Sequence, residues 1–283
     1  LGLFGYPPVE YEVGRGVLAA LGVEFDLRHG DLAARINFCT LDENGVVTDR
    51  RAGRIPTEKC IELCGLLDEI GIDGVETFVV PVKQHRACVV FRGEGLTDDV
   101  PDTGPGLVGE KPVPVEGVER TRDIVREFQD RAGEILHDRH PANFILMRGF
   151  ALHREFPSMN RRFRLKPAAV ALYPMYRGVA SLVGMDVMDS SPETLQGQAE
   201  ASARAVSEGY DFLFVHHKPA DSSGEDGNVQ AKIEAIESFD RALPSLLSTG
   251  FDVVCITGDH STPCPLKLHS WHPVPVLLHG GAQ

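Results

Sequence analysis

The second half of the chain alternates short apolar runs with amphipathic segments. Runs of strand length are predicted at residues 167–173, 210–215, 251–256 and 274–278. Helical spacing is predicted between them, at residues 192–208 and 228–247. Continuous apolar strands that alternate with helices are typical of a parallel sheet covered on both faces. The pattern therefore predicts an α/β fold for this half.

The first half has a different pattern. Residues 35–41 and 46–50 flank Asp42-Glu-Asn-Gly45, which is a strong hairpin signal. Further strands are predicted at residues 75–82, 87–92 and 145–147, and helices at residues 57–70 and 118–136. These features predict an α+β unit with antiparallel pairing. We place the boundary between the two halves near residue 150.

Charge and composition narrow the classes of partner. The chain has 283 residues, a hydrophobic content of 42% and a formal net charge of -13. This charge argues against nucleic acid or an anionic membrane as the main partner, but a local basic cluster could still bind a small anion. No run approaches the roughly 20 apolar residues that span a bilayer. Five of the six cysteines lie within or beside apolar, periodic segments, as buried free thiols do, so we expect a cytoplasmic protein.

Acidic and imidazole groups follow two of the predicted strands. Asp221 and Glu225 come after residues 210–215, whereas Asp259, His260 and His269 come after residues 251–256. If these strands are parallel neighbours, both loops leave the sheet at its carboxyl edge. Carboxylate and imidazole are ligands of divalent first-row metals. The sequence thus predicts a site for one or two ions, with ordinary surface loops as the alternative.

A resemblance to a known family is carried by Ile256-Thr-Gly-Asp-His-Ser-Thr-Pro, by His269-Ser-Trp-His-Pro-Val-Pro-Val-Leu and by His217-Lys-Pro-Ala-Asp-Ser-Ser-Gly-Glu-Asp-Gly-Asn. These motifs resemble the archaeal-type, cofactor-independent phosphoglycerate mutases of the alkaline phosphatase superfamily. Upstream segments follow in family order, among them Arg35-Ile-Asn-Phe and Asp49-Arg-Arg-Ala-Gly-Arg. The resemblance covers essentially the whole chain.

The resemblance implies an alkaline-phosphatase-like parallel-sheet core with an inserted α+β lid domain. Residues 1–20 would be a remnant of the core, residues 21–150 the lid, and residues 151–283 the metal-binding core. The implied activity is the interconversion of 3-phosphoglycerate and 2-phosphoglycerate, a step of glycolysis and gluconeogenesis. It would proceed through a phosphoserine with two divalent ions and without bisphosphoglycerate.

The resemblance also assigns metal ligands. Asp259 and His260 would hold the ion nearer the serine, and Asp221 and His269 the other. Glu225 stands where many relatives have His, and a carboxylate is a harder ligand than imidazole. We therefore expect manganese, with magnesium, cobalt or zinc as alternatives.

Basic residues are candidates for binding a small phosphorylated metabolite. Arginine binds phosphate or carboxylate bidentately, and the resemblance places such groups mainly in the lid. The candidates are Arg50, Arg51, Arg54, Arg148 and Lys166, with His85 and Arg86 as weaker ones. Ordinary exposed arginines are the alternative for each position.

The resemblance implies that the nucleophilic serine and a further metal-binding aspartate precede Leu1, and that relatives continue beyond Gln283. Ser222, Ser223, Ser261 and Ser270 do not match the nucleophile. Phosphoglycerate mutase is the leading hypothesis. The alternatives are another metal-dependent phosphotransferase or phosphatase of the superfamily, and a non-catalytic metal- or metabolite-binding relative. Homo-oligomerisation is left open.

Overall fold

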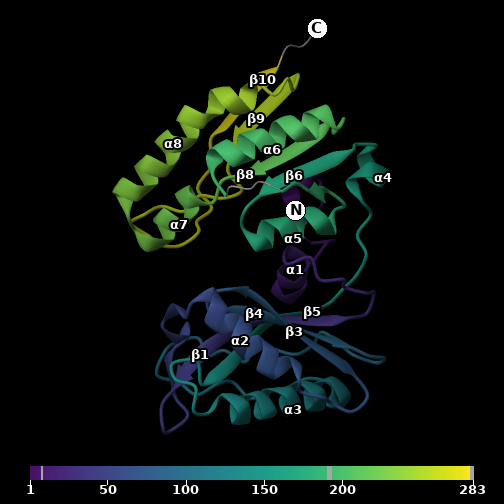
Figure 1. Ribbon diagram of the computed structural model, residues 1–283, viewed down its shortest axis with the longest axis vertical. Helices are drawn as coiled ribbons and strands as arrows, with labels where there is room; N and C mark the ends of the chain where they lie inside the picture. The colour runs from purple at the N-terminus through teal and green to yellow at the C-terminus, as the bar shows by residue number, and fades with distance from the viewer. Residues whose placement is uncertain (8, 190–192, 281–283) are drawn as a thin grey trace. The chain divides into compact units, whose positions relative to one another are not determined.

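The chain folds into two compact units in the computed structural model, which describes residues 1–7, 9–189 and 193–280. One unit combines Leu1–Pro8 with Pro157–Gln283, and Val9–Phe156 forms the other as an insertion between them (Figure 1). These bounds differ from the expected ones at residues 20 and 150. Residues 9–20 go with the insertion because helix α1 (Arg15–Gly22) packs on its sheet.

The inserted unit is built on a five-stranded sheet with the order β2-β1-β4-β3, and β5 pairs with β1. All its strand pairs are antiparallel, as the hairpin pattern predicted. The strands are β1 (Leu32–Leu41), β2 (Val47–Asp49), β3 (Glu76–Lys83), β4 (Arg86–Arg92) and β5 (Phe144–Leu152).

Both faces of this sheet are covered, because the side chains of a strand alternate between them. On β1, the buried residues Leu32, Ile36 and Phe38 pack in a core with α2 (Thr57–Asp68) and α3 (Glu119–Leu136). Ala33 points the other way, toward a smaller apolar cluster with Val17 of α1. Figure 1 shows α1 and α3 on opposite sides of the sheet.

The other unit contains the predicted parallel sheet, in the order β7-β6-β8. Its strands are β6 (Pro167–Ala171), β7 (Asp186–Val187) and β8 (Phe212–His216). Its helices are α4 (Met159–Phe163), α5 (Pro174–Leu182), α6 (Leu195–Ser207), α7 (Pro219–Asp226) and α8 (Val229–Leu247). Pro192, the expected start of the helix at 192–208, lies outside the described residues.

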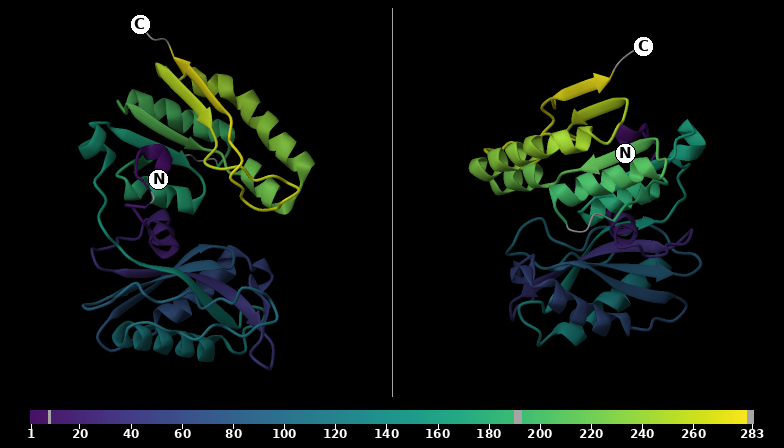
Figure 2. Two further views of the ribbon diagram at one scale, coloured as in Figure 1. Left: turned by 180° about the vertical axis from the view of Figure 1, so that it is seen from behind. Right: turned by 45° about the horizontal axis from the view of Figure 1, so that its top comes forward.

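The last two strands do not extend this parallel sheet. β9 (Val253–Thr257) and β10 (Val276–Gly280) pair with each other in an antiparallel sheet of two strands (Figure 2). Within the described residues β8 pairs with β6 and not with β9. The two strands that precede the predicted ligands are therefore not parallel neighbours, which the metal-site prediction had assumed. Apolar side chains of β9 and β10 are exposed, with Val253 at 61% and Leu278 at 73%.

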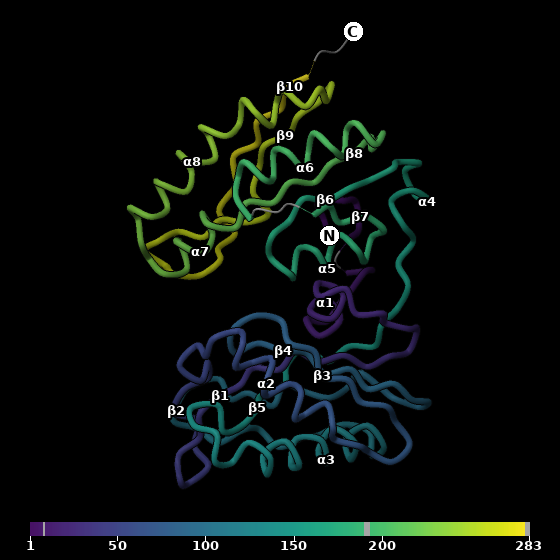
Figure 3. The backbone as a smooth tube through the Cα atoms, in the orientation of Figure 1, coloured from purple at the N-terminus to yellow at the C-terminus, as the bar shows by residue number. Residues whose placement is uncertain are grey.

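Aromatic packing holds the first residues in this unit. The Phe4 ring meets the Phe214 ring edge-on at 4.9 Å between centroids. The Tyr6 hydroxyl donates a hydrogen bond to the Pro157 carbonyl at 2.6 Å. The contact between Tyr6 and Pro157 joins residues that are 151 positions apart in the sequence, and Figure 3 traces the backbone path between them. Among the described residues, no helix is both long and apolar enough to cross a membrane.

The contact between α1 and β1 yields a stability prediction. A Cβ atom on Gly16 would lie 2.2 Å from the Ala33 carbonyl oxygen, which is backbone and cannot rotate away. We expect Gly16→Ala to lower the free energy of unfolding by about 3 kcal/mol, measured by urea denaturation. Gly65→Ala is the matched control, because its Cβ would enter open space on α2. The control should stabilise by about 0.5–1 kcal/mol, and equal effects of the two substitutions would contradict the packing argument.

Candidate metal centre

Two segments bring the predicted ligands together. Helix α7 follows β8 almost directly and begins at Pro219, a favoured first helical residue. Asp221 and Glu225 lie four residues apart on α7 and so share a face. The second segment follows β9, and a bridge between Ser261 and Ser270 folds it back on itself. This fold returns His269 to the side of His260.

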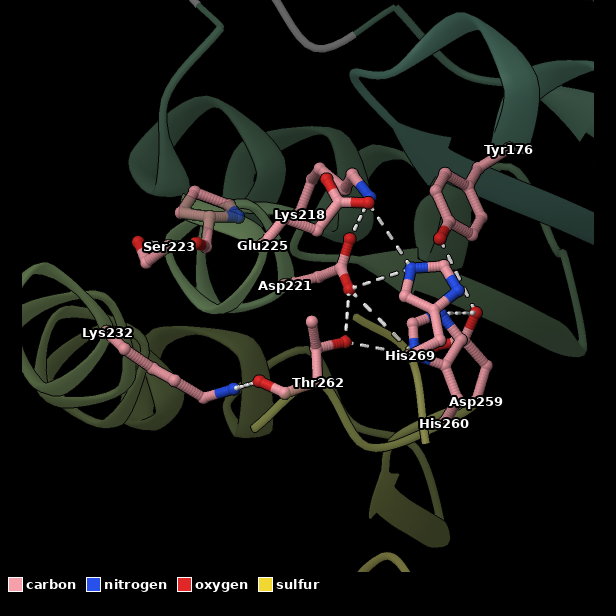
Figure 4. Close-up of polar contacts among 11 residues, drawn as sticks. Tyr176, Lys218, Asp221, Ser223, Glu225, Lys232, Asp259, His260, Thr262 and His269 are labelled. Carbon is pink, nitrogen blue, oxygen red and sulfur yellow. Dashed lines mark hydrogen bonds and ion pairs between the residues drawn. The ribbon is translucent and has the colours of Figure 1, made fainter. Parts of the chain in front are cut away.

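Asp221, His260 and His269 form one group, because each offers a ligand atom and these atoms all lie within 4.8 Å of one another. Oδ1 of Asp221 lies 3.4 Å from Nε2 of His269 and 3.8 Å from Nδ1 of His260. The two imidazole rings stack with centroids 3.8 Å apart. Oε1 of Glu225 is also 3.4 Å from Nε2 of His269. Figure 4 shows these side chains converging on Asp221.

The Asp221 carboxylate is the most heavily contacted group of the centre. Lys218 donates to its Oδ2, and the Thr262 hydroxyl donates to its Oδ1 at 2.5 Å. Burial raises the pKa of Asp221, but the hydrogen bonds from Lys218 and Thr262 and the charges of Lys218 and His269 outweigh it, so the pKa is lowered. Asp221 is therefore an anion at neutral pH.

Asp259 lies outside the three-residue group but touches it. Its Oδ2 is 3.6 Å from Nε2 of His260 and accepts a hydrogen bond from the Tyr176 hydroxyl at 3.4 Å. Burial and the charges of Asp259 and Asp221 raise the pKa of Tyr176, so the phenol keeps its proton. The Tyr176 ring also stacks on the His216 ring, which gives both rings a fixed position beside Asp259.

Gly224 allows α7 to lie against the second segment. A Cβ atom at this position would be 2.2 Å from the Thr262 carbonyl oxygen. That oxygen also accepts a hydrogen bond from Nζ of Lys232 at 2.7 Å, so α8 holds the segment as well. The distance between Asp221 and the histidines thus depends on a residue without a side chain.

The donor set fits a divalent metal ion. Ligand atoms about 2.1 Å from a tetrahedrally coordinated ion are about 3.4 Å from one another, close to the spacings that Asp221, Glu225 and His269 show. Two imidazoles with carboxylates suit zinc or manganese better than calcium, which prefers oxygen ligands alone. Thr262 supports Asp221 and also contacts Nδ1 of His260 at 3.2 Å, as a supporting residue of a metal ligand does.

The predicted substrate-binding residues have different surroundings. In the inserted unit, Arg50 donates to the Gly106 carbonyl at 2.9 Å, whereas Arg51 and Arg54 are exposed. Arg148 donates to Asp102 at 3.1 Å, and its strand register sets it opposite Arg35. In the other unit, Nζ of Lys166 donates to the Glu208 carbonyl at 2.6 Å and lies over the Tyr210 ring. These contacts give Lys166 a structural role at the end of α6.

Sequence reasoning passed over Lys218, Thr262 and Tyr176. Lys218 and Thr262 stand inside the motifs that carried the metal prediction, so their proximity to the ligands could have selected them. Tyr176 lies on α5, and no sequence pattern connects it to Asp259. Only the three-dimensional arrangement shows that contact.

Comparisons with known proteins agree with this geometry. A family model described as 2,3-bisphosphoglycerate-independent phosphoglycerate mutase matches residues 1–143. A model of the metalloenzyme superfamily matches residues 141–283, which include all the predicted metal ligands. The chain belongs to the 2,3-bisphosphoglycerate-independent phosphoglycerate mutase family. It is therefore an enzyme of the isomerase class, and its α/β core is of the metalloenzyme type.

Relatives in this family span most of the chain. A probable 2,3-bisphosphoglycerate-independent phosphoglycerate mutase of Aquifex aeolicus is 47% identical over 99% of this chain and 72% of its own length. One from Thermus thermophilus is 48% identical over 98% of this chain and 70% of its own length. The solved cofactor-independent phosphoglycerate mutase of Thermoplasma acidophilum has a TM-score of 0.66 at 31% identity, covering 98% of this chain and 74% of that one. A Pyrococcus horikoshii structure has a TM-score of 0.79 at 28% identity, covering 99% of this chain and 71% of that one.

The hydrogen bond from Thr262 gives a test of the centre. Thr262→Val keeps the shape of the side chain but removes the hydroxyl that contacts Asp221 and His260. We expect the affinity for Mn²⁺ to fall about tenfold, measured by calorimetric titration of the metal-free protein. Thr249→Val is the control, because its hydroxyl donates to the Leu246 carbonyl at the end of α8, away from the metal ligands. Unchanged affinity in Thr262→Val would show that the Thr262 hydroxyl does not support the ligands of the ion.

Proposed function

We propose that the protein interconverts 3-phosphoglycerate and 2-phosphoglycerate through a phosphoserine intermediate, with the serine contributed from outside these 283 residues. Two divalent ions, which we expect to be manganese, would serve the reaction, and bisphosphoglycerate would not be needed. The observation that carries the proposal is the convergence of Asp221, His260 and His269 in a chain of this mutase family.

We divide the ligands between two ions as the family resemblance implies. Asp221 and Glu225 both approach Nε2 of His269, so these three residues would hold one ion. Asp259 and His260 would contribute to the other, with further ligands from outside the described segments. Such ions supply Lewis acidity toward phosphoryl oxygens and lower the pKa of a bound hydroxyl.

The residues around the ligands set charge and orientation. Lys218 keeps Asp221 ionised, and Thr262 fixes the rotamer of its carboxylate by a hydrogen bond. Tyr176 donates to Asp259 and, with its raised pKa, remains a hydrogen-bond donor at neutral pH. Metabolite binding would fall to Arg50, Arg51, Arg54 and Arg148, whose guanidinium groups fit phosphate and carboxylate. Lys166 is a weaker candidate because its ammonium group is already engaged.

Another phosphotransferase or phosphatase of the superfamily is the second candidate. The metal cluster alone does not distinguish this candidate from the mutase, since the same donor set serves many phosphate reactions. The match of the mutase model to residues 1–143 favours the mutase, because this segment contains most of the inserted unit and its arginines. The convergence of Asp221, His260 and His269 favours a catalytic role over a non-catalytic one.

A coupled assay tests the activity. The full-length protein with Mn²⁺ should convert 3-phosphoglycerate to 2-phosphoglycerate, and His269→Gln should lower kcat at least 100-fold, since it removes an imidazole that two carboxylates approach. His137→Gln is the matched control, because that imidazole is exposed and pairs with the neighbouring Asp138. Absence of 2-phosphoglycerate despite bound metal would overturn the mutase proposal in favour of the second candidate.

A charge-matched pair tests substrate binding. Arg54→Gln should raise KM for 3-phosphoglycerate about tenfold or more, since a hydrogen bond to a charged group contributes about 1.5–3 kcal/mol. Arg122→Gln removes the same charge from an exposed pair with Asp123 on α3 and should leave KM unchanged. Equal KM values in the two variants would remove Arg54 from the substrate site.

A further inference from the structure

The two oxygens of the Asp221 carboxylate have different neighbours. Oδ1 lies 3.4 Å from Nε2 of His269 and 3.8 Å from Nδ1 of His260, and it accepts the hydrogen bond from Thr262. Oδ2 instead accepts a hydrogen bond from the Lys218 ammonium. Figure 4 shows Lys218 at one oxygen and Thr262 at the other. The imidazoles and the ammonium therefore approach different oxygens of one carboxylate.

The first turn of α7 fixes the position of this ammonium. Lys218 is the N-cap residue of the helix, and Asp221 follows three residues later, a spacing that brings two side chains onto one face. The Lys218 carbonyl also accepts a hydrogen bond from the Asp221 amide at 3.0 Å. The two side chains are 20% and 15% exposed, so water and salt screen this ion pair less than they screen a surface pair.

Two aromatic rings lie near the same ammonium. Nζ of Lys218 is 5.6 Å from the ring centroid of Tyr173 and 5.8 Å from that of Tyr176, within the range of cation–π attraction. Tyr176 is itself buried, and its ring stacks on that of His216. Both rings favour a charged ammonium at this place, so we expect the ammonium to stay beside Oδ2 when an ion binds at Oδ1.

A carboxylate can coordinate a metal ion through one oxygen or through both. Coordination through both oxygens of Asp221 would place a divalent ion next to Oδ2, where the Lys218 ammonium already lies. Two cations at one oxygen repel each other, and this repulsion is weakly screened inside a protein. Oδ1 has a second lone pair for the ion beside the one that Thr262 uses. An ion held by the two imidazoles would therefore bind Asp221 through Oδ1 alone.

We propose that Lys218 restricts Asp221 to coordination through one oxygen and thereby selects a small first-row divalent ion over calcium. Calcium takes about six to eight oxygen ligands and often uses both oxygens of a carboxylate, whereas a first-row ion accepts imidazole nitrogen and needs fewer oxygens. Loss of the second oxygen thus weakens calcium binding more. Lys218 acts as a specificity-determining residue without touching the ion. The inference rests on the proposed metal site and is independent of the reaction that the site serves.

Calorimetric titration of the metal-free, full-length protein with Mn²⁺ and with Ca²⁺ tests the inference. The ratio of the dissociation constant for Ca²⁺ to that for Mn²⁺ is the Mn²⁺ preference. Removing a positive charge near the centre changes the affinity for both divalent ions in the same direction, so the charge effect largely cancels in this ratio. In Lys218→Met the Mn²⁺ preference should fall about tenfold, because Asp221 can then use both oxygens. Lys218→Arg, which keeps a cation beside Oδ2, should retain most of the preference.

Lys59→Met is the matched control. Lys59 and Glu62 form an ion pair with the same spacing on α2, in the inserted unit, which contains none of the proposed ligands. This substitution should leave the Mn²⁺ preference unchanged.

An infrared difference spectrum between metal-bound and metal-free protein gives a second readout. Coordination through both oxygens narrows the separation between the two carboxylate stretching bands. The bands of Asp221 are assigned from their loss when Asp221→Asn is introduced. With Ca²⁺, these bands should lie closer together in Lys218→Met than in the wild type.

Three results would overturn the inference while Mn²⁺ still binds. The first is an equal Mn²⁺ preference in Lys218→Met and the wild type, and the second is an equal fall in Lys218→Met and Lys218→Arg. The third, which does not require Lys218→Met to fold, is two-oxygen coordination by Asp221 in the infrared spectrum of the wild type. Failure of the wild type to bind Mn²⁺ would overturn the proposed metal site together with this inference. If the preference falls as expected but no 2-phosphoglycerate forms, the role of Lys218 stands and the mutase proposal fails.

Discussion

The metal centre depends on the concentration of hydrogen-bond donors and cations around one carboxylate, that of Asp221. A carboxylate that is 15% exposed needs compensation for its lost hydration. Lys218 and Thr262 provide it through hydrogen bonds, and two imidazoles lie within 4 Å. These contacts tie α7 to the segment after β9, and the remaining contacts of the site follow from that connection. Asp221 and the two imidazoles would hold an ion bound here, and the ion would supply positive charge to this carboxylate.

The sequence indicated which residues converge in this centre better than it indicated how the backbone brings them together. The Asp, Glu and His residues that follow two apolar strands include the three residues that converge, Asp221, His260 and His269; whether they bind a metal ion stays a prediction. The route by which they converge was different from the predicted one. β9 pairs with β10 and not with β8, so a shared sheet edge does not explain the proximity. The proximity is explained by Gly224, which has no side chain, and by the hydrogen bond from Lys232 to Thr262. The order of residues along the chain does not specify such long-range contacts.

The inserted unit illustrates the same limit. Alternating hydrophobicity and the Asp42-Glu-Asn-Gly45 turn predicted the antiparallel sheet, because both signals are local. The assignment of α1 to this unit was not predictable, since it rests on the fit of Gly16 against Ala33. The arginines of residues 50–54 were conspicuous in the sequence, but the left-handed backbone that presents them was not.

The β9–β10 pair has a consequence for the physical behaviour of these residues in solution. A ribbon of two strands is a template for further strands, and the apolar side chains Val276, Leu277 and Leu278 are more than 60% exposed along one of its edges. Association of several copies through this ribbon would bury that surface. The formal net charge of -13 opposes such association by mutual repulsion. The tendency of these residues to associate should therefore rise with ionic strength, because salt screens the repulsion and leaves the hydrophobic attraction in place.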